Sequence, residues 1–361
     1  MDKPFRVIDL GIRDGRWNIA LDQALIDCHK AGLAPDTIRF LSFPPTALVG
    51  RHQALAREVR LDYCRAHGIA VGRRITGGGA IYLDEGQIGW ELIFHRRTLK
   101  LGNLADLARE ICKAAAAGLR RLGVEAHFRP RNDIEVGGRK ISGTGGYFDG
   151  DTLFYQGTLL IAIDSPHMTG ALNVPEHKLR KRALDGAGQR VVSLRELLGP
   201  RTPPLAAVKQ ALLDGFAAHL GITPQPGALS AKESTLADGY FAHEIGTDAF
   251  VHEIDDPSGA DIHSGQHVAP GGVIIAHVRF DGAARDRIRR VLITGDFFVT
   301  PPRLVYDLEA RLQGVAVQDA PAVIEDFFKR HGADLLSVKP SDFIAALVAA
   351  MKGEGAAAAA R

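Results

Sequence analysis

The sequence predicts an α+β protein, with a largely antiparallel sheet and packed helices in a first domain and a small second α+β domain after it. Three observations support this prediction. Short runs of alternating apolar residues are joined by Gly-containing turns, and apolar residues at helical spacing occupy separate segments. A stretch with two prolines and several small polar residues, 221–239, interrupts the chain. Strands linked by short turns, with helices gathered elsewhere, are typical of α+β folds.

Composition narrows the class of protein. The 361 residues suit roughly two domains of about 150 residues each, and 46% apolar with 24% charged residues is ordinary for a folded domain. A net charge of +2 gives no reason to expect a nucleic-acid partner. Three cysteines without a CxxC pair favour a reducing compartment. The N-terminus lacks an apolar signal-peptide core and no run approaches about 20 apolar residues, so we expect a cytoplasmic protein with no membrane partner.

The first predicted elements are two helices and a strand. Residues 17–32 place apolar side chains near one helix face and end at Gly32. Residues 87–96 alternate apolar and other residues, which indicates a strand. In 103–124, leucine, isoleucine and alanine recur at helical spacing, with Asn103 as the expected N-cap and Gly123 as the expected C′ residue.

Hairpins and the second domain follow. Residues 131–146 read as strand, tight Gly-Gly turn and strand, and 149–163 add a turn and another strand. Beyond the boundary, 271–298 hold two strand-like runs, and helices are expected near 303–314 and 320–332. The expected divisions are a catalytic domain at 1–228, a linker at 229–249, an accessory domain at 250–352 and a low-complexity tail at 353–361.

A glycine triplet, Gly77 to Gly79, follows Arg73 and Arg74. Glycine is favoured where another group approaches the backbone closely or where φ is positive. The neighbouring arginines suggest that this group is an anion. The spacing fits neither a dinucleotide-binding fingerprint nor a P-loop. The chain continues into strand-like residues, so we expect a glycine loop between strands; a plain turn is the alternative.

A lysine lies in the predicted hairpin "RNDIEVGGRKISGTGG". Lys140 is flanked by small residues, Ser142, Gly143 and Gly145, and a strand lysine in such surroundings can point at a ligand. Asn132 and Asp133 stand on the preceding strand, so the hairpin can present a lysine, a carboxamide and a carboxylate to one site. The alternative is an ordinary exposed hairpin lysine. A serine-hydrolase elbow is excluded, because G-x-S-x-G would need glycine at 140.

Together these stretches resemble the lipoate–protein ligase family of the biotin/lipoate ligase superfamily. The resemblance covers roughly 15–225 in order, supported by "NIALDQAL", "VGRHQ" and "QRVVSLREL". The residues that carry it are Arg73, Arg74, Thr76, Gly77, Gly78, Gly79, Ala80, Asp84, Asn132, Asp133, Lys140, Ile141, Ser142, Gly143, Gly157, Thr158, Leu159 and Leu160.

The resemblance implies an ATP-dependent, two-step attachment of lipoate to a lysine of a lipoyl-carrier domain or protein, through a lipoyl-adenylate. It implies Lys140 as the catalytic residue that neutralises charge on the reacting carboxylate and carbonyl. It also implies phosphate contacts from Arg74, phosphate and acyl contacts from the loop Gly77–Tyr82, an Mg²⁺ or adenylate contact from Asp133, and a hydroxyl from Thr158. The remaining implied binding residues are Ala80, Ile81, Tyr82, Asn132, Ser142, Gly143 and Gly157.

The sequence departs from the family pattern at four positions. Leu83 and Gln156 stand where histidine is common, Gln87 where asparagine is common, and Ala54 where asparagine often follows the glutamine. The first two change polar groups close to the implied site, so they bear on the acyl substrate and the acceptor more than on the reaction.

Two other functions stay open. An octanoyltransferase would use no ATP; one type carries a nucleophilic cysteine just before the lysine strand, where this chain reads "HFRPRNDIEV", and no cysteine follows Cys112 for the other type. A non-catalytic lipoate-binding module is the second alternative, against which Lys140 and Arg74 argue.

Weaker signals complete the sequence. The basic stretch 177–185 is either a solvated helix face or a contact for an acidic carrier or the adenylate. His263 and His267 are expected in a loop without a metal. Cys28 and Cys112 are expected in apolar helix faces.

Overall fold

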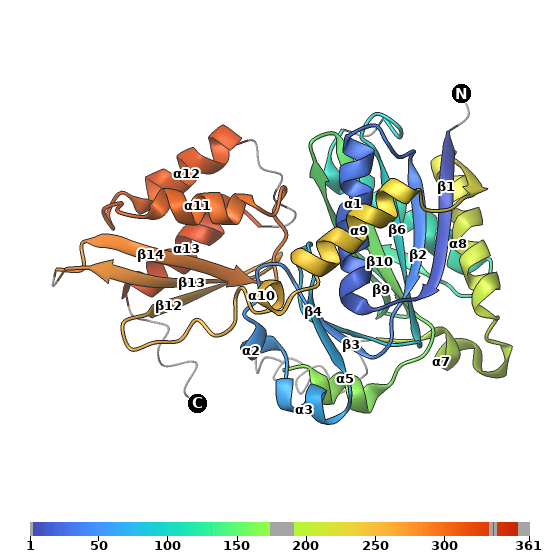
Figure 1. Cartoon of the computed structure of the whole chain (residues 1–361), viewed down its shortest axis with the longest axis horizontal. Coiled ribbons are helices and arrows are strands. Elements are labelled where there is room, and N and C mark those ends of the chain that lie inside the picture. Colours follow the sequence, from blue (N-terminus) through green and yellow to red (C-terminus); the bar gives the residue numbers. More distant parts are fainter. Residues whose placement is uncertain are drawn as a thin grey trace. The chain divides into compact units, whose positions relative to one another are not determined.

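A computed structural model gives the fold and describes residues 3–100, 102–130, 132–173, 191–282, 284–331, 335 and 338–352 (Figure 1). The chain divides into two compact units that interleave along the sequence. Unit 1 comprises Met1–Leu48, Val59–Arg73 and Ile81–Val251, and unit 2 comprises Val49–Glu58, Arg74–Ala80 and His252–Arg361. Among the described helices, none has both the length and the apolar composition that crossing a membrane requires.

Unit 1 is built on an eight-stranded sheet with strand order β11-β1-β2-β6-β10-β9-β8-β7. The edge pairs β11–β1 and β1–β2 are parallel, and the pairs from β2 to β7 are antiparallel. Within the antiparallel part, β7, β8, β9 and β10 are joined by short turns, as the sequence predicts, whereas β2, β6 and β10 are separated by long segments of the chain. The strands are β1 Pro4–Ile12, β2 Thr37–Ser42, β6 Gln87–His95, β7 His127–Arg129, β8 Asp133–Val136, β9 Arg139–Asp149, β10 Thr152–Leu160 and β11 Thr223–Pro226.

Helices cover both faces of this sheet. Helix α1 (Gly15–Lys30) packs against α9 (Ala231–His243), and α4 (Leu104–Arg120) packs against α8 (Leu205–Leu220). Neighbouring residues of β6 show that these pairs lie on opposite faces, since successive strand side chains point to opposite sides. The Trp90 ring lies 5.4 Å from Phe216 of α8, whereas the Glu91 carboxylate meets Arg39, which also binds α1.

The α1 face holds a buried charged cluster. The Arg39 guanidinium pairs with Asp22 of α1 and, at 3.2 Å, with Glu91 of β6, and it donates to the Asn18 side chain at 2.6 Å. Burial raises the pKa of both carboxyl groups, because two carboxylates share one cation out of water. The motif "NIALDQAL" therefore joins helix α1 to the sheet through Asn18 and Asp22.

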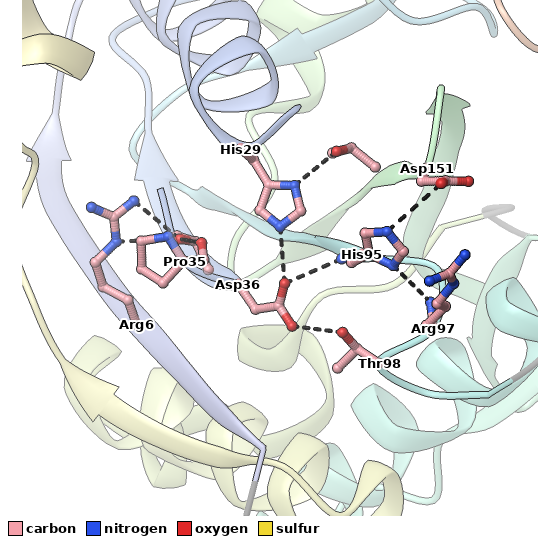
Figure 2. A network of polar contacts seen from close by, with 10 residues as sticks. Arg6, His29, Pro35, Asp36, His95, Arg97, Thr98 and Asp151 are labelled. Atoms are coloured by element: carbon pink, nitrogen blue, oxygen red, sulfur yellow. Dashed lines mark hydrogen bonds and ion pairs between the residues drawn. The ribbon is translucent and has the colours of Figure 1, made fainter. Parts of the chain in front are cut away.

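A second polar cluster ties the end of the sheet where β10 begins (Figure 2). The Asp36 carboxylate accepts from His29 Nε2 at 2.9 Å, from the His95 backbone N–H at 3.1 Å and from Thr98 Oγ1 at 2.7 Å. His29 Nδ1 lies 2.7 Å from Thr152 Oγ1. Thr152 is buried and its hydroxyl contacts His29, so this Asp–His–Thr arrangement is a contact of the interior. It fixes the end of β10 that is remote from Leu159.

Smaller elements complete unit 1. A three-stranded sheet has the order β4-β3-β5, and α9 with the short α10 fills the segment that the sequence favoured as a linker, 229–249. Helix α9 begins with a capping box between Ser230 and Glu233, and the Glu233 carboxylate is also paired with Arg6 of β1. The elements are β3 Thr46–Val49, α3 Leu61–Ala66, β4 Ala70–Arg73, β5 Ile81–Leu83, α5 Ser165–Ala171, α7 Leu194–Leu198, η1 Gly199–Arg201 and α10 Asp248–Val251.

Unit 2 is a three-stranded antiparallel sheet, β12-β13-β14, with three helices packed into one apolar core. Phe297, Phe328 and Phe343 form the aromatic centre, with ring centroids 5.1–5.2 Å apart for the two pairs that Phe343 makes. The elements are α2 Leu55–Glu58, β12 His263–Ala269, β13 Gly272–Asp281, β14 Arg287–Gly295, α11 Leu304–Leu312, α12 Ala320–His331 and α13 Pro340–Lys352.

The predicted helices and strands lie within four residues of their expected limits. Asn103 caps α4 by accepting from the Asp106 N–H, as predicted, while Gly123 has positive φ two residues beyond the cap residue Arg121. The loop expected around His263 and His267 is wrong, since both lie in β12. The glycine-rich composition concealed a strand because Gly265 faces α13, where a Cβ would lie 1.9 Å from the Ala350 nitrogen.

Candidate functional site

The centre of the candidate site in unit 1 is an ion pair between neighbouring strands. Lys140 Nζ of β9 lies 2.7 Å from Asp133 Oδ1 of β8. The side chains are 40% and 24% exposed, so a cation is held in place while remaining open to a ligand. The predicted lysine and carboxylate are therefore brought together.

A β-bulge aims the lysine at the carboxylate. Asp133 pairs with Gly143 and Ile134 with Ser142, but the next residue, Glu135, pairs with Lys140, so β9 carries one extra residue. A bulge turns the following side chains to the other face. Lys140 consequently shares a face with Gly143 and Asp133, although regular alternation would place positions 140 and 143 on opposite faces.

Two positions near the ion pair require glycine, each for a different steric reason. A Cβ at Gly143 would lie 2.6 Å from both Cε and Nζ of Lys140, so the missing side chain gives the lysine its path to Asp133. A Cβ at Gly157 would lie 2.2 Å from the Trp90 ring. Gly157 is thus explained by packing on the α4–α8 face, whereas Gly143 belongs to the lysine face.

Thr158 and Asn132 flank the pair in distinct ways. Thr158 of β10 is the cross-strand partner of Gly143, which places it on the lysine face. Asn132 is held to β9, because its carbonyl accepts from the Thr144 N–H at 2.9 Å and its side-chain amide donates to the Thr144 carbonyl. Asn132 therefore fixes the residue before Asp133.

Ser142, which the sequence suggests as a binding residue, lies on the face opposite to Lys140. It lies two residues from Thr144, whose hydroxyl is 3.3 Å from Cys112 Sγ of α4, and regular pairing with β10 continues through both residues. Ser142 is 1% exposed, and within the described part of the chain its hydroxyl has no hydrogen-bond partner. Because of the bulge, the Ser142 and Lys140 side chains lie on opposite faces of the sheet. No pattern in the sequence predicts that bulge.

The glycine loop Arg74–Ala80 belongs to unit 2. Arg74 Nη2 donates to the carbonyls of Gly77 at 3.2 Å and Gly79 at 2.8 Å, and burial lowers the pKa of its guanidinium to about 10, so it stays charged. Arg74 thus binds its own loop in this structure, where the sequence suggested an anion.

Close backbone approach explains the first two glycines of the triplet, Gly77 and Gly78. A Cβ at Gly77 would lie 2.2 Å from the Phe297 carbonyl oxygen, and Gly78 has φ +92 with its N–H donating to that same carbonyl at 3.2 Å. The Phe298 ring would be 2.8 Å from a Cβ at Gly78. The glycines therefore let the segment after β14 pack directly on the loop.

The residues on either side of the loop lie in unit 1. Arg73 Nη2 donates to the Val251 carbonyl at 2.9 Å, which is a structural contact. Ile81 and Tyr82 form β5, and burial, with Asp84 and Asp164 nearby, raises the pKa of the Tyr82 phenol. Asp84 closes a turn by accepting from the Gly86 N–H at 2.7 Å.

A cleft of about 550 Å³ lies beside this turn. Three carboxylates and one guanidinium line it, so it suits a polar ligand better than an acyl chain. Its lining residues are Asp84, Glu85, Gly86, Ala162, Ile163, Asp164, Pro166 and Arg195.

The possible metal ligands of the site are its His, Cys, Asp and Glu side chains. No group of three or more His, Cys, Asp or Glu side chains that could hold a metal occurs among the described residues. Asp133 therefore belongs to no three-ligand protein cluster within the described ranges, and it fits Mg²⁺ as a carboxylate that acts beside substrate phosphates. His267 contacts Asp342 at 3.1 Å instead. The basic stretch 177–185 lies outside the described residues.

Thr144 and Tyr155 are polar residues of the interior for which the sequence contains no motif. Both lie in strands where alternation marks them only as inward-facing, and their hydroxyls are 2.6 Å apart in the interior. The register of the β9–β10 hairpin brings them together, and the alternation within each strand does not give that register.

Comparison with known proteins identifies the family. The family described as the lipoyl protein ligase A/B catalytic domain matches residues 14–217. Octanoyltransferase LipM of Symbiobacterium thermophilum is 30% identical over 271 residues, covering 69% of this chain and 98% of that protein.

Two solved structures share the fold. One is the bi-partite lipoate protein ligase of Thermoplasma acidophilum, 25% identical with a TM-score of 0.63, covering 70% of this chain and 97% of that one. P. falciparum LipL1 is 17% identical with a TM-score of 0.69 and covers 91% of this chain and 94% of that one, which shows the fold alone. The matched residues contain the lysine hairpin and its bulge, and the chain belongs to the lipoate–protein ligase and octanoyltransferase family of the biotin/lipoate ligase superfamily.

Proposed function

We propose that this enzyme attaches lipoate to a lysine of a lipoyl-carrier domain or protein in an ATP-dependent reaction with a lipoyl-adenylate intermediate. The burial of its cysteines is the observation that favours a ligase over an octanoyltransferase within the family. Cys28, Cys64 and Cys112 are 0–2% exposed, and they are all the cysteines of the chain. An acyl transfer through an enzyme thioester needs an accessible thiolate.

Burial disfavours the thiolate at all three positions. It raises the pKa of Cys28 and Cys64, and it raises that of Cys112 to about 11. Each thiol therefore stays protonated near neutral pH and out of reach of a substrate. This supports direct transfer to the acceptor amine.

Lys140 is assigned to both chemical steps. In the first, a lipoate carboxylate oxygen bonds to the α-phosphorus of ATP, the bond to the β-phosphate oxygen breaks, and pyrophosphate leaves. Two anions must approach each other, and a fixed ammonium lowers that repulsion. The Asp133 carboxylate keeps the ammonium from swinging away, because it holds Nζ at 2.7 Å.

In the second step the acceptor lysine, as the neutral amine, attacks the acyl carbonyl. The amide bond forms, the carbonyl–phosphate bond breaks, AMP leaves, and the amine gives a proton to solvent. Negative charge develops on the carbonyl oxygen, and the Lys140 ammonium suits that charge. We assign to the Thr158 hydroxyl a hydrogen bond to the adenylate from the same face. Mg²⁺ would accompany the ATP phosphates and neutralise part of their charge, with Asp133 as its protein carboxylate.

The loop Gly77–Tyr82 is retained as the proposed contact for phosphate and acyl groups. Arg74 is assigned a shaping role in it, because its guanidinium binds two loop carbonyls. Asn132 and Gly143 are assigned positioning roles beside Lys140. The proposed setting is the cytoplasm, with no nucleic-acid or membrane partner.

An octanoyltransferase is the second candidate, favoured by the 30% identity to a LipM protein. The test is ATP–pyrophosphate exchange with lipoate, octanoate and biotin, together with acyl transfer from an octanoyl-carrier protein without ATP. Exchange that depends on lipoate or octanoate supports the ligase. Transfer without ATP and no exchange would establish the octanoyltransferase, and binding without either activity would leave a lipoate-binding module.

Lys140→Met is expected to abolish both exchange and transfer from preformed lipoyl-adenylate. The fold should persist, since Lys140 is partly exposed and its methylenes are replaced by an apolar chain of similar length. Lys113→Met is the matched control, because Lys113 also makes an ion pair, with Glu110 at 3.0 Å on α4. Ligation by the Lys140 variant at a near wild-type rate would refute the assignment.

A further inference from the structure

Three buried polar side chains meet behind the Asp133 hairpin. Cys112 Sγ of α4 lies 3.3 Å from Thr144 Oγ1 and 3.4 Å from the Tyr155 hydroxyl, and the two hydroxyls are 2.6 Å apart. All three residues are buried. Polar groups in such a place are costly unless each is hydrogen-bonded, and satisfied networks define one geometry.

The direction of these hydrogen bonds follows from the number of hydrogens. Thr144 Oγ1 donates its one hydrogen to the Asn132 carbonyl at 2.8 Å. The Tyr155 hydroxyl must then donate to Thr144 Oγ1. Burial raises the pKa of the Tyr155 phenol and of the Cys112 thiol, so both keep their hydrogens. A donor chain therefore runs from the interior to one carbonyl.

That carbonyl precedes the carboxylate of the site. The Asn132 carbonyl accepts from both the N–H and the hydroxyl of Thr144, at 2.9 and 2.8 Å. Asp133 is the next residue, and its carboxylate holds Lys140. The chain of hydrogen-bond donors thus ends one peptide unit before Asp133, whose carboxylate holds the Lys140 ammonium.

We propose that Tyr155 and Thr144 are positioning residues for the Lys140–Asp133 pair, acting through the Asn132 carbonyl. Neither touches the lysine face. Loss of either hydroxyl lets the Asn132–Asp133 segment move relative to β9. The ion pair between Asp133 and Lys140 then becomes weaker. The consequence for catalysis rests on the proposed function, whereas the consequence for Lys140 itself does not.

The test uses the full chain and variants that change a hydroxyl with little change of volume. Tyr155→Phe and Thr144→Val remove one hydroxyl each, and Thr144→Ser keeps it. Tyr240→Phe is the matched control, because its hydroxyl donates to Asp27 at 2.7 Å between α9 and α1. The first readout is the rate at which acetic anhydride labels the Lys140 amine, measured by peptide mass spectrometry relative to Lys113.

Labelling of Lys140 should rise about fivefold in Tyr155→Phe and Thr144→Val, the ratio expected for one lost hydrogen bond. It should match wild type in Thr144→Ser and Tyr240→Phe. Unchanged labelling in folded Tyr155→Phe and Thr144→Val overturns the proposal. If Tyr155→Phe does not fold, the comparison of Thr144→Val with Thr144→Ser decides.

The second readout is lipoate-dependent ATP–pyrophosphate exchange. Tyr155→Phe and Thr144→Val should lower kcat about fivefold or more at unchanged KM for ATP, with Thr144→Ser near wild type. A rise in KM alone would contradict a positioning role. If wild type shows no exchange while the labelling differences appear, the ligase proposal fails and this inference stands.

Discussion

At the scale of single residues, the position of Lys140 depends on an extra residue in β9 and on the missing side chain at Gly143. The bulge turns the lysine to the face of Asp133, and Gly143 leaves room for its methylenes. The neighbouring Gly157 serves another purpose, since the Trp90 ring fills its space. Gly143 therefore serves the placement of Lys140, and Gly157 serves the packing of the core.

Gly143→Ala should reduce exchange on the order of 100-fold while stability changes by less than about 0.5 kcal/mol. The new methyl group meets the flexible end of Lys140, which can move aside but then leaves Asp133. Gly157→Ala should instead cost about 1–3 kcal/mol of unfolding free energy, because it meets a rigid indole in the core.

Urea unfolding followed by fluorescence measures both variants, since Trp17 and Trp90 are the two tryptophans and both lie in unit 1. Exchange assays on the folded proteins give the activity. Full activity of Gly143→Ala would show that Lys140 needs no contact with Asp133.

At the scale of elements, α11 meets β14 through a partly buried carboxyl group. Glu309 Oε1 accepts from the Ile293 N–H at 2.6 Å. Burial raises the pKa of Glu309 to about 7, more than the Ile293 bond lowers it, and Glu253 raises it further. Between the unfolded value near 4.3 and about 7, the folded state therefore holds a proton that the unfolded state has released.

The stability of unit 2 should consequently fall as pH rises from about 4.5 to 7.5. The loss is on the order of 2 kcal/mol, after allowance for partial exposure. Glu309→Gln should remove this slope and keep the acceptor for the Ile293 N–H. Hydrogen exchange of β13 and β14 peptides measures the slope, because the tryptophans report on unit 1 only.

The exposed Glu325 of α12 supplies the control, and Glu325→Gln should leave the slope as in wild type. A pH-independent difference between wild type and Glu309→Gln would mean that Glu309 is ionised throughout.

At the scale of the whole molecule, the two units share the family's sequence motifs between them. The segments Val49–Glu58 and Arg74–Ala80, which carry "VGRHQ" and the glycine loop, belong to unit 2. Gly295 N–H donates to the His52 carbonyl at 3.0 Å, and the loop packs on Phe297 and Phe298. A truncation that removes the C-terminal residues therefore deprives the glycine loop of the chain it packs on.

A cut after Val251 preserves α9, whose Glu233 pairs with Arg6, whereas a cut near Leu229 would remove it. We expect fragment 1–251 to transfer lipoate from preformed lipoyl-adenylate but to lose ATP–pyrophosphate exchange, because activation needs the glycine loop in place. Adding 252–361 as a separate chain should restore part of the exchange. Exchange by 1–251 alone at the full rate would assign the C-terminal part another task, such as acceptor recognition.

Residue patterns alone indicate the fold class, the family and the position of the lysine hairpin. Local periodicity identifies β6 and α4, and Asn103 caps its helix with a bond three residues away. Such features depend on neighbours in the chain, so a sequence displays them directly. Lys140 and Asp133 were paired correctly for the same reason, since a short hairpin joins them.

Which groups share a face, and which unit each segment joins, follows from the packing of the folded chain. The bulge separates Ser142 from Lys140, and the donor chain from Tyr155 to Asn132 exists only because β9, β10 and α4 meet. The first two glycines of the triplet, for which the sequence suggests an anion site, lie against the backbone of Phe297, more than 200 residues further along. Contacts between segments so far apart depend on packing and closure of the fold, which no local pattern encodes.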